Sequence, residues 1–382
     1  MKRPPKTLST KLPALDGLRG IAILMVLVSH TVFGWQGAMA PLTIVTGWQQ
    51  TFVLPQWMRA VADSGDHGVT LFFVVSAFTL TLSFSRNTDL AAYTIRRLAR
   101  VGPAYWLAAF AYSLAYGLGP RQWAPNGSTM TDVIVAALFG TAWHADSGAY
   151  GVVPGGWSVS CEVTFYAALP FLILLIQGRV WRAAALTGAT CLGLQLFARH
   201  IMSRGGWHYA PEYVSPLSQA PVFLFGITAA ILVQRVDLPR LPGAALALLA
   251  VAIFALPFSP VREWTLLPHL AFAGLVAAAT GLVAVHPPRW LAEGLLPRVG
   301  LVSYSLYLVH FAVEWPSMWL AERVLPGLGW PTFFVHSALT AAGGYALAEL
   351  LHRWVEQPGI AVGRFLTAGR RQKSWADYNT AL

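Results

Sequence analysis

Apolar runs of membrane-spanning length recur along the chain, and they limit its possible folds more than any other feature. A helix needs about 20 residues to cross roughly 30 Å of hydrocarbon. We predict spans near 15–35, 68–85, 102–118, 157–177, 183–198, 217–234, 241–258, 266–286, 300–319 and 331–350. Because 56% of the 382 residues are hydrophobic and only 11% are charged, soluble globular classes are excluded. The sequence therefore predicts an all-α, polytopic transmembrane helix bundle of about ten spans.

The distribution of positive charge predicts how this bundle is oriented. With the N-terminus in the cytoplasm, 20 of the 26 Lys and Arg fall in cytoplasmic segments and six fall outside the cell membrane. Those six are Arg59, Arg121, Arg199, Arg204, Arg262 and Arg323. The bias predicts that the N- and C-termini are both cytoplasmic. It also explains the formal net charge of +10, so we expect membrane lipids, and no nucleic acid, as partners of the basic residues.

The remaining organisation is simple. We expect residues 1–350 to form one transmembrane domain and residues 351–382 to form a basic cytoplasmic tail. The apolar segment 131–144 is too short to cross a bilayer, and we expect it to be re-entrant or interfacial. Cys161 and Cys191 lack the paired spacing of metal ligands, so we predict neither a metal site nor a disulfide framework.

The first predicted span carries two ionisable residues, Arg19 and His30. Their separation of 11 residues returns a helix to within roughly 20° of its starting direction and raises it by about 16 Å. Each residue alone has a structural explanation, because Arg19 can extend to lipid headgroups and His30 can pair between helices. Together they are costly to bury on one face of a membrane helix, which favours a functional role. A neutral histidine can act as a general base near pH 7.

Three later clusters add polar groups to the bundle. Arg97 and Arg100 lie three residues apart and can clamp a phosphorylated ligand, although ordinary juxtamembrane charge is the alternative. Glu162 enters a span just after a glycine turn and can orient a histidine, bind an acceptor hydroxyl or pair structurally with an arginine. Tyr307 and His310 belong to a polar stripe in the ninth span, which helix packing through hydroxyl groups explains in part.

Taken in chain order, these motifs resemble those of the acyltransferase 3 family of bacterial membrane enzymes over nearly the whole chain. The similar segments are Arg19 to His30, Leu71 to Thr79, Arg97 to Arg100, Gly156 to Val159, Glu162, Ser303 to His310 and Val355 to Pro358. Ala77 stands where the family usually has glycine, so we expect less close helix contact there, and Val159 replaces a leucine. The resemblance implies an O-acyltransferase of the bacterial cytoplasmic membrane, with acyl-CoA, expected to be acetyl-CoA, as the donor and no metal.

The resemblance and the residue chemistry together give a predicted mechanism. The donor phosphates are expected on the arginines, and His30 is expected to deprotonate an acceptor hydroxyl that attacks the thioester directly. Glu162 is expected to orient His30, and Ser158 or Tyr307 to stabilise the oxyanion. The predicted catalytic residues are His30, Arg19 and Glu162; the donor-binding residues are Arg97, Arg100, Arg19, Trp157 and Ser158; the other polar residues along the path are Ser76, Tyr307 and His310.

Several alternatives stay open at the level of sequence. Within the same class, a covalent acyl-enzyme on Cys161 or His30 would replace direct transfer. From other classes, the chain could be a transporter of an acyl group or a lipid-linked sugar, or a membrane sensor or scaffold. The expected acceptor is a hydroxyl of a glycan, of a lipid-linked sugar or of a glycosylated small molecule.

Overall fold

The structure is a computed structural model. It describes residues 12–35, 65, 67–86, 88–120, 124, 126–144, 151–203, 214–239, 243–252, 267–326 and 330–370. All the regular elements in these ranges are helices, which agrees with the predicted all-α class. Five described helices are long and apolar enough to cross a membrane: α1 (Pro13–Trp35), α3 (His67–Arg86), α7 (Gly156–Ile176), α10 (Pro216–Arg235) and α12 (Leu267–Val285). A sixth candidate span is a pair of segments, Arg289–Leu301 and Ser303–Val324, that bend by 56° at Val302.

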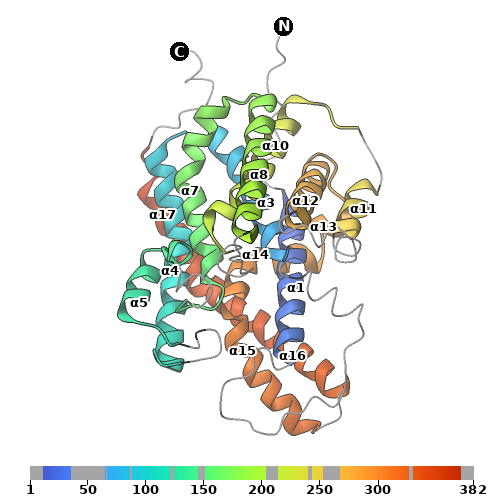
Figure 1. Cartoon of the computed structure of the whole chain (residues 1–382). Coiled ribbons are helices and arrows are strands. Elements are labelled where there is room, and N and C mark those ends of the chain that lie inside the picture. Colours follow the sequence, from blue (N-terminus) through green and yellow to red (C-terminus); the bar gives the residue numbers. More distant parts are fainter. Residues whose placement is uncertain are drawn as a thin grey trace.

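The other helices complete the bundle seen in Figure 1. They are α4 (Leu90–Tyr116), α5 (Met130–Ala137), η1 (Thr141–Trp143), α8 (Val180–Ser203), α11 (Ala244–Ala250), α13 (Arg289–Ala292), α14 (Leu295–Leu301), α15 (Ser303–Val324), α16 (Trp330–Leu351), the π-helical turn η5 (His352–Glu356) and α17 (Gln357–Leu366). Every predicted span overlaps one of these helices, although much of the run 241–258 lies outside the described residues. The number of ten spans and the cytoplasmic termini stay predictions.

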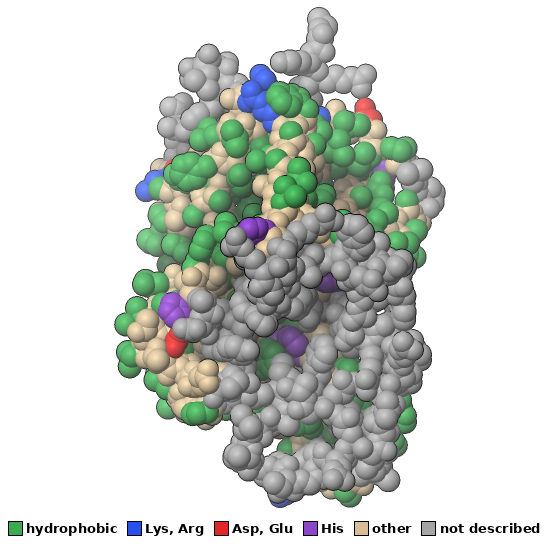
Figure 2. Space-filling view, in the orientation of Figure 1, with side chains coloured by type: hydrophobic (Ala, Val, Ile, Leu, Met, Phe, Trp, Pro, Cys, Tyr) green, Lys and Arg blue, Asp and Glu red, His purple; other side chains and the backbone are tan. Residues whose placement is uncertain are grey.

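Side-chain types on the surface fit a bilayer environment. Figure 2 shows that hydrophobic side chains cover most of the described surface on one face, while Lys and Arg gather mainly toward the upper end of the view. Large apolar side chains such as Phe110, Leu114 and Phe171 are well exposed on their helices. In water such a surface would be unfavourable, whereas lipid tails solvate it at no cost.

The centre of the bundle is built around α1, which contacts α3, α13, α14 and α15. Close approach depends on glycines at the crossing points. A Cβ on Gly300 would collide with the backbone oxygen of Asp16, so α14 can lie against α1 only with glycine there. The predicted loose contact at Ala77 is compensated, because Gly226 of α10 faces Ala77 and the Val74 carbonyl of α3. The small residue that allows close helix contact therefore lies on the neighbouring helix α10 instead of on α3.

The segment 131–144 forms two short pieces, α5 and η1, joined through Phe139, whose φ is 57°. The α5 helix contacts α4, and η1 contacts α7. Eight residues of α5 extend only about 12 Å, so this helix cannot cross a bilayer. Whether the segment re-enters the membrane or lies at its surface stays a prediction.

At the other end of the chain, helical structure runs on past residue 350. The α16 helix passes through the π-helical turn η5 into α17, which packs along α4. Gly359 and Gly363 allow this contact, because a side chain at either position would collide with Ala99. The division of the chain at residue 350 is not marked by a break in structure and stays a prediction; residues 371–382 lie outside the described part.

Candidate active site

A cavity of about 760 Å³ opens between α1, α3, α4, α7, α15 and α17. Its volume suits a ligand of cofactor size. Among the residues that the structure describes, five arginines line it, against the two carboxyl groups of Asp16 and Glu162. The five are Arg19, Arg86, Arg97, Arg100 and Arg364. The cavity therefore favours a ligand that carries several negative charges.

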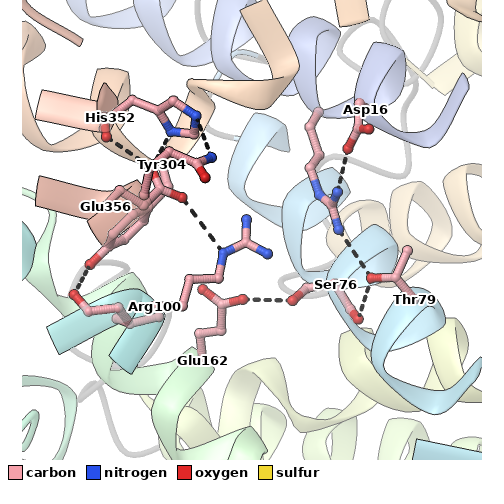
Figure 3. Close-up of polar contacts among 12 residues, drawn as sticks. Asp16, Ser76, Thr79, Arg100, Glu162, Tyr304, His352 and Glu356 are labelled. Carbon is pink, nitrogen blue, oxygen red and sulfur yellow. Dashed lines mark hydrogen bonds and ion pairs between the residues drawn. The ribbon is translucent and has the colours of Figure 1, made fainter. Parts of the chain in front are cut away.

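Arg19 is held at the cavity wall from two sides. Its guanidinium donates to the carboxylate of Asp16 at 2.6 Å and to the hydroxyl of Thr79 at 3.0 Å. Thr79 in turn donates to the carbonyl of Val75 at 2.9 Å. Figure 3 shows that this group connects α1 with α3 across one side of the cavity. The arginine is thus fixed in position before any ligand binds.

Arg97 and Arg100 reach the cavity from α4, as their three-residue spacing predicts. Asp89 caps this helix by accepting from the amide of Ala92 at 2.9 Å. The Nε atom of Arg97 is buried and has no hydrogen-bond partner among the described residues. An unpaired buried guanidinium nitrogen is costly, so Arg97 is available to an anionic ligand.

Arg100 has a partner that sequence reasoning left outside the site. Its Nε lies 3.7 Å from Oε1 of Glu356, which is 1% exposed. The same carboxylate accepts from Ser305 at 3.0 Å and lies 2.8 Å from Nδ1 of His352 (Figure 3). The π-helical turn, a feature often found at functional sites, places Glu356 toward Arg100. The closing segment Val355 to Pro358 was the available signal, because at the end of the last predicted span it leaves Glu356 available to an arginine, and the structure identifies Arg100 as that arginine.

The second part of the site is a pair of histidines. Nδ1 of His30 on α1 lies 2.8 Å from Nε2 of His310 on α15, and the two rings are nearly parallel, 3° apart. Nδ1 of His310 lies 2.7 Å from the carbonyl oxygen of Tyr307. Neither histidine lines the arginine cavity, whereas Tyr307 does, one helical turn before His310. Tyr307 therefore stands between the cavity and the histidine pair.

These contacts decide where the protons of the neutral pair lie. A carbonyl oxygen can only accept, so Nδ1 of His310 must carry its proton, and Nε2 of His310 is left as an acceptor. Nδ1 of His30 must then be the donor to that acceptor. It follows that Nε2 of His30 is unprotonated, as a general base requires.

Comparison with known proteins agrees with this geometry. The model of a family described as an acyltransferase domain matches residues 12–349. The chain belongs to this acyltransferase family. It is therefore an acyltransferase, and it moves groups other than aminoacyl groups.

Relatives of this acyltransferase are distant but similar over nearly the whole chain. Acyltransferase MdmB of Streptomyces mycarofaciens is 25% identical over 93% of the chain and 92% of its own length. A protein of Staphylococcus aureus named as an O-acetyltransferase is 25% identical over 91% of the chain, and one of Bacillus subtilis named as a peptidoglycan O-acetyltransferase is 25% identical over 94%. The chain spans 57% and 56% of the lengths of those two relatives. No solved structure matches the chain.

The structure places Glu162 differently from the predicted arrangement. Glu162 lines the arginine cavity of the acyltransferase and accepts from the hydroxyl of Ser76 at 2.6 Å (Figure 3). The ring nitrogen of His30 is bonded instead to His310. The expectation that Glu162 orients His30 therefore does not match the described contacts, and His310, expected only as a polar residue along the path, occupies that position. Sequence spacing could not show this, because His30 and His310 are 280 residues apart.

The structure also changes two expectations: which hydroxyl stabilises the oxyanion, and whether Trp157 contacts the donor. Ser158 and Tyr307 both line the cavity, but both hydroxyls donate to the carbonyl of Gly155, each at 3.0 Å. Either would have to leave that carbonyl before it could donate to an oxyanion. Trp157 does not line the cavity, and its ring packs edge-on against Phe73 with the ring centres 6.2 Å apart.

The cavity also contains residues that the sequence did not single out. Arg86 and Arg364 come from the ends of α3 and α17, where they resemble ordinary juxtamembrane charge. Tyr304 lines the cavity as well and donates to the carbonyl of Val101 at 2.8 Å.

Cys161 lies outside the cavity with its thiol 3.6 Å from the carbonyl of Val214, so it is poorly placed as a nucleophile. Among the described residues, no three His, Cys, Asp or Glu side chains are grouped as metal ligands.

Proposed function

We propose that this acyltransferase moves an acyl group, acetyl in the simplest case, from acyl-CoA to a hydroxyl group of a carbohydrate or glycosylated acceptor. The observation that carries the proposal is the arginine-lined cavity, connected through Tyr307 to a histidine whose Nε2 is free to accept a proton. The five arginines suit the phosphate groups of CoA. The names of the relatives from Staphylococcus aureus and Bacillus subtilis support O-acetylation, and the latter supports a glycan as the acceptor.

The distance between the two parts of the site supports CoA in particular. Arg19 and His30 lie on the single helix α1, and 11 residues of α-helix rise about 16 Å. A donor held by its phosphates at the arginines therefore needs a long, narrow arm to bring its acyl group to His30. CoA has such an arm between its phosphates and its thioester sulfur.

The reaction then follows from the His30 tautomer. Nε2 of His30 accepts the proton of the acceptor hydroxyl as the oxygen attacks the thioester carbonyl. The new C–O bond forms, the C–S bond breaks, and the departing thiolate takes the proton from His30, so acceptor and donor become ester and free CoA. His310 keeps its hydrogen bond to Nδ1 of His30 throughout and steadies the imidazolium. We propose that the protein lies in a bacterial cytoplasmic membrane and that the phosphate-binding side of the cavity faces the cytoplasm.

Acyl transfer by the purified protein tests this proposal. The protein in lipid nanodiscs is incubated with acetyl-CoA labelled in the acetyl group and with methyl glycosides of glucose and of N-acetylglucosamine. We expect labelled ester on a glycoside and one free CoA thiol for each ester. In a second arm the protein is placed in sealed vesicles, where movement of intact acetyl-CoA across the membrane, without ester or thiol, would show transport instead.

A further inference from the structure

One buried face of α15 carries polar groups for most of its length. The residues are Ser303, Tyr307, His310, Glu314 and Ser317, spaced by four, three, four and three residues, and all five are buried. Residues at this spacing share one helix face. The stripe begins at the arginine cavity with Ser303 and Tyr307, reaches the histidine pair at His310, and continues beyond it to Glu314.

Glu314 differs from the other acidic residues near the site. Its side chain is 1% exposed, and neither carboxyl oxygen has a hydrogen-bond partner among the residues that the structure describes. By contrast, Glu162 accepts from Ser76, and Glu356 accepts from Ser305 and lies close to Arg100. Burying a carboxyl group without partners is unfavourable, and within a membrane helix it is more so. Nothing in the described part of the chain therefore offsets the cost of burying Glu314, and a ligand is a candidate for its partner.

The position of Glu314 indicates which ligand this is. The donor cavity and its arginines lie on one side of the histidine pair, and Glu314 lies one helical turn away on the other. Residues four apart on a helix have Cβ atoms about 6 Å apart, a separation that one sugar ring can bridge. The carboxyl oxygens of Glu314 can accept from the hydroxyl donors of a carbohydrate, and an acidic side chain is a poor partner for the phosphates of the donor.

We propose that Glu314 is the acceptor-binding residue, which holds a neighbouring hydroxyl of a carbohydrate while His30 deprotonates the reacting one. This rests on the proposed function, because it takes His30 as the base. It adds a second binding site, on the opposite side of the histidine pair from the donor. Acceptor and donor thus approach the pair from opposite ends of the stripe on α15.

The test compares E314Q and E314L with wild type and with E349Q as a control. Glu349 is an exposed acid on α16 that accepts from Tyr345 at 2.6 Å. For each purified protein in nanodiscs, three quantities are measured: the unfolding temperature, the affinity for acetyl-CoA, and the affinity for the methyl glycosides of glucose and of N-acetylglucosamine, followed by calorimetry. Binding is measured without turnover, so its outcome does not depend on whether the protein transfers acyl groups.

We expect E314L to bind the glycosides about 10- to 100-fold more weakly, because one buried sugar hydroxyl is left without a partner. E314Q, whose amide oxygen can still accept, should lie between E314L and wild type. Affinity for acetyl-CoA should stay within twofold, the unfolding temperature should rise or stay equal, and E349Q should match wild type. Unchanged glycoside affinity in E314Q and E314L would overturn the inference. A fall in unfolding temperature in both variants would also overturn it, because Glu314 would then have a structural role. So would a wild-type protein that binds neither glycoside. If wild type binds glycosides through Glu314 but forms no ester, the proposed function fails and this site stands.

Discussion

Replacing His310 tests the part of the mechanism that the structure defines most sharply. In the wild-type pair, Nε2 of His310 accepts from Nδ1 of His30 at 2.8 Å, and this contact leaves the other nitrogen of His30 free. His310→Ala removes the acceptor, so His30 can take either tautomer and can rotate. Only one tautomer in one orientation is productive.

The expected loss can be bounded from the same contact. A buried hydrogen bond contributes about 0.5–1.5 kcal/mol, and leaving its partner unsatisfied costs about 1–3 kcal/mol. General-base catalysis as a whole is worth about 10²- to 10⁴-fold. We therefore expect H310A to lower kcat about 10- to 100-fold, less than the loss of the base itself. The donor KM should be unchanged, because His310 does not line the arginine cavity.

The assay is steady-state acyl transfer with acetyl-CoA varied at a fixed, saturating glycoside concentration. H310Q serves as a matched variant, because its amide oxygen can accept from Nδ1 of His30 and should restore part of kcat. Unfolding temperatures of all variants show whether each protein is folded. A kcat within twofold of wild type in H310A, or a donor KM that rises as far as kcat falls, would refute the tautomer argument.

Three further predictions concern the donor cavity and the packing around it. Arg97→Ala should raise the acetyl-CoA dissociation constant about 10- to 100-fold, because Arg97 offers an unpaired buried donor to the phosphates; unchanged calorimetric affinity would remove it from the donor site. Gly300→Ala should lower stability by about 1–3 kcal/mol, because the new Cβ meets the Asp16 carbonyl. Gly188→Ala is its control, since a Cβ there meets nothing, and equal unfolding temperatures in the two variants would contradict the packing account. Asp89→Ala should lower stability by about 1 kcal/mol through loss of the α4 cap. Hydrogen bonding from the Ala92 amide lowers the pKa of Asp89 from its ordinary 3.8, so the part of this stability that depends on the Asp89 charge should be present above the ordinary pKa and be lost as pH falls through the folded-state pKa. A difference that grows on acidification would disprove this.

The class of fold was predictable from the sequence because it depends on local properties. Runs such as 15–35 and 68–85 contain enough apolar residues to cross a bilayer whatever their neighbours are. The same holds for the shared side of Arg97 and Arg100, which helix periodicity fixes. The extension of α4 back to Leu90 was not predicted, because the charged stretch before residue 102 lowers its hydropathy without reducing its helix propensity.

The candidate site was only partly predictable because its decisive contacts join distant segments. Motif spacing brought out His30, Arg19 and the α4 arginines, which lie on single helices. It could not pair His30 with His310, nor show which arginine lies beside Glu356, since helix packing and not spacing creates these contacts. Nor did it single out Glu314, because the sequence does not show whether a buried acid has a partner.

The central claim is that Nε2 of His30 is the base for acyl transfer from CoA to a hydroxyl. It is tested most directly by the rate of ester formation from labelled acetyl-CoA in His30→Ala, alongside acetyl-CoA affinity in the same purified protein. We predict a rate at least about 100-fold below wild type with unchanged donor affinity, because the arginine cavity does not include His30. Ester formation at the wild-type rate in H30A would contradict the account.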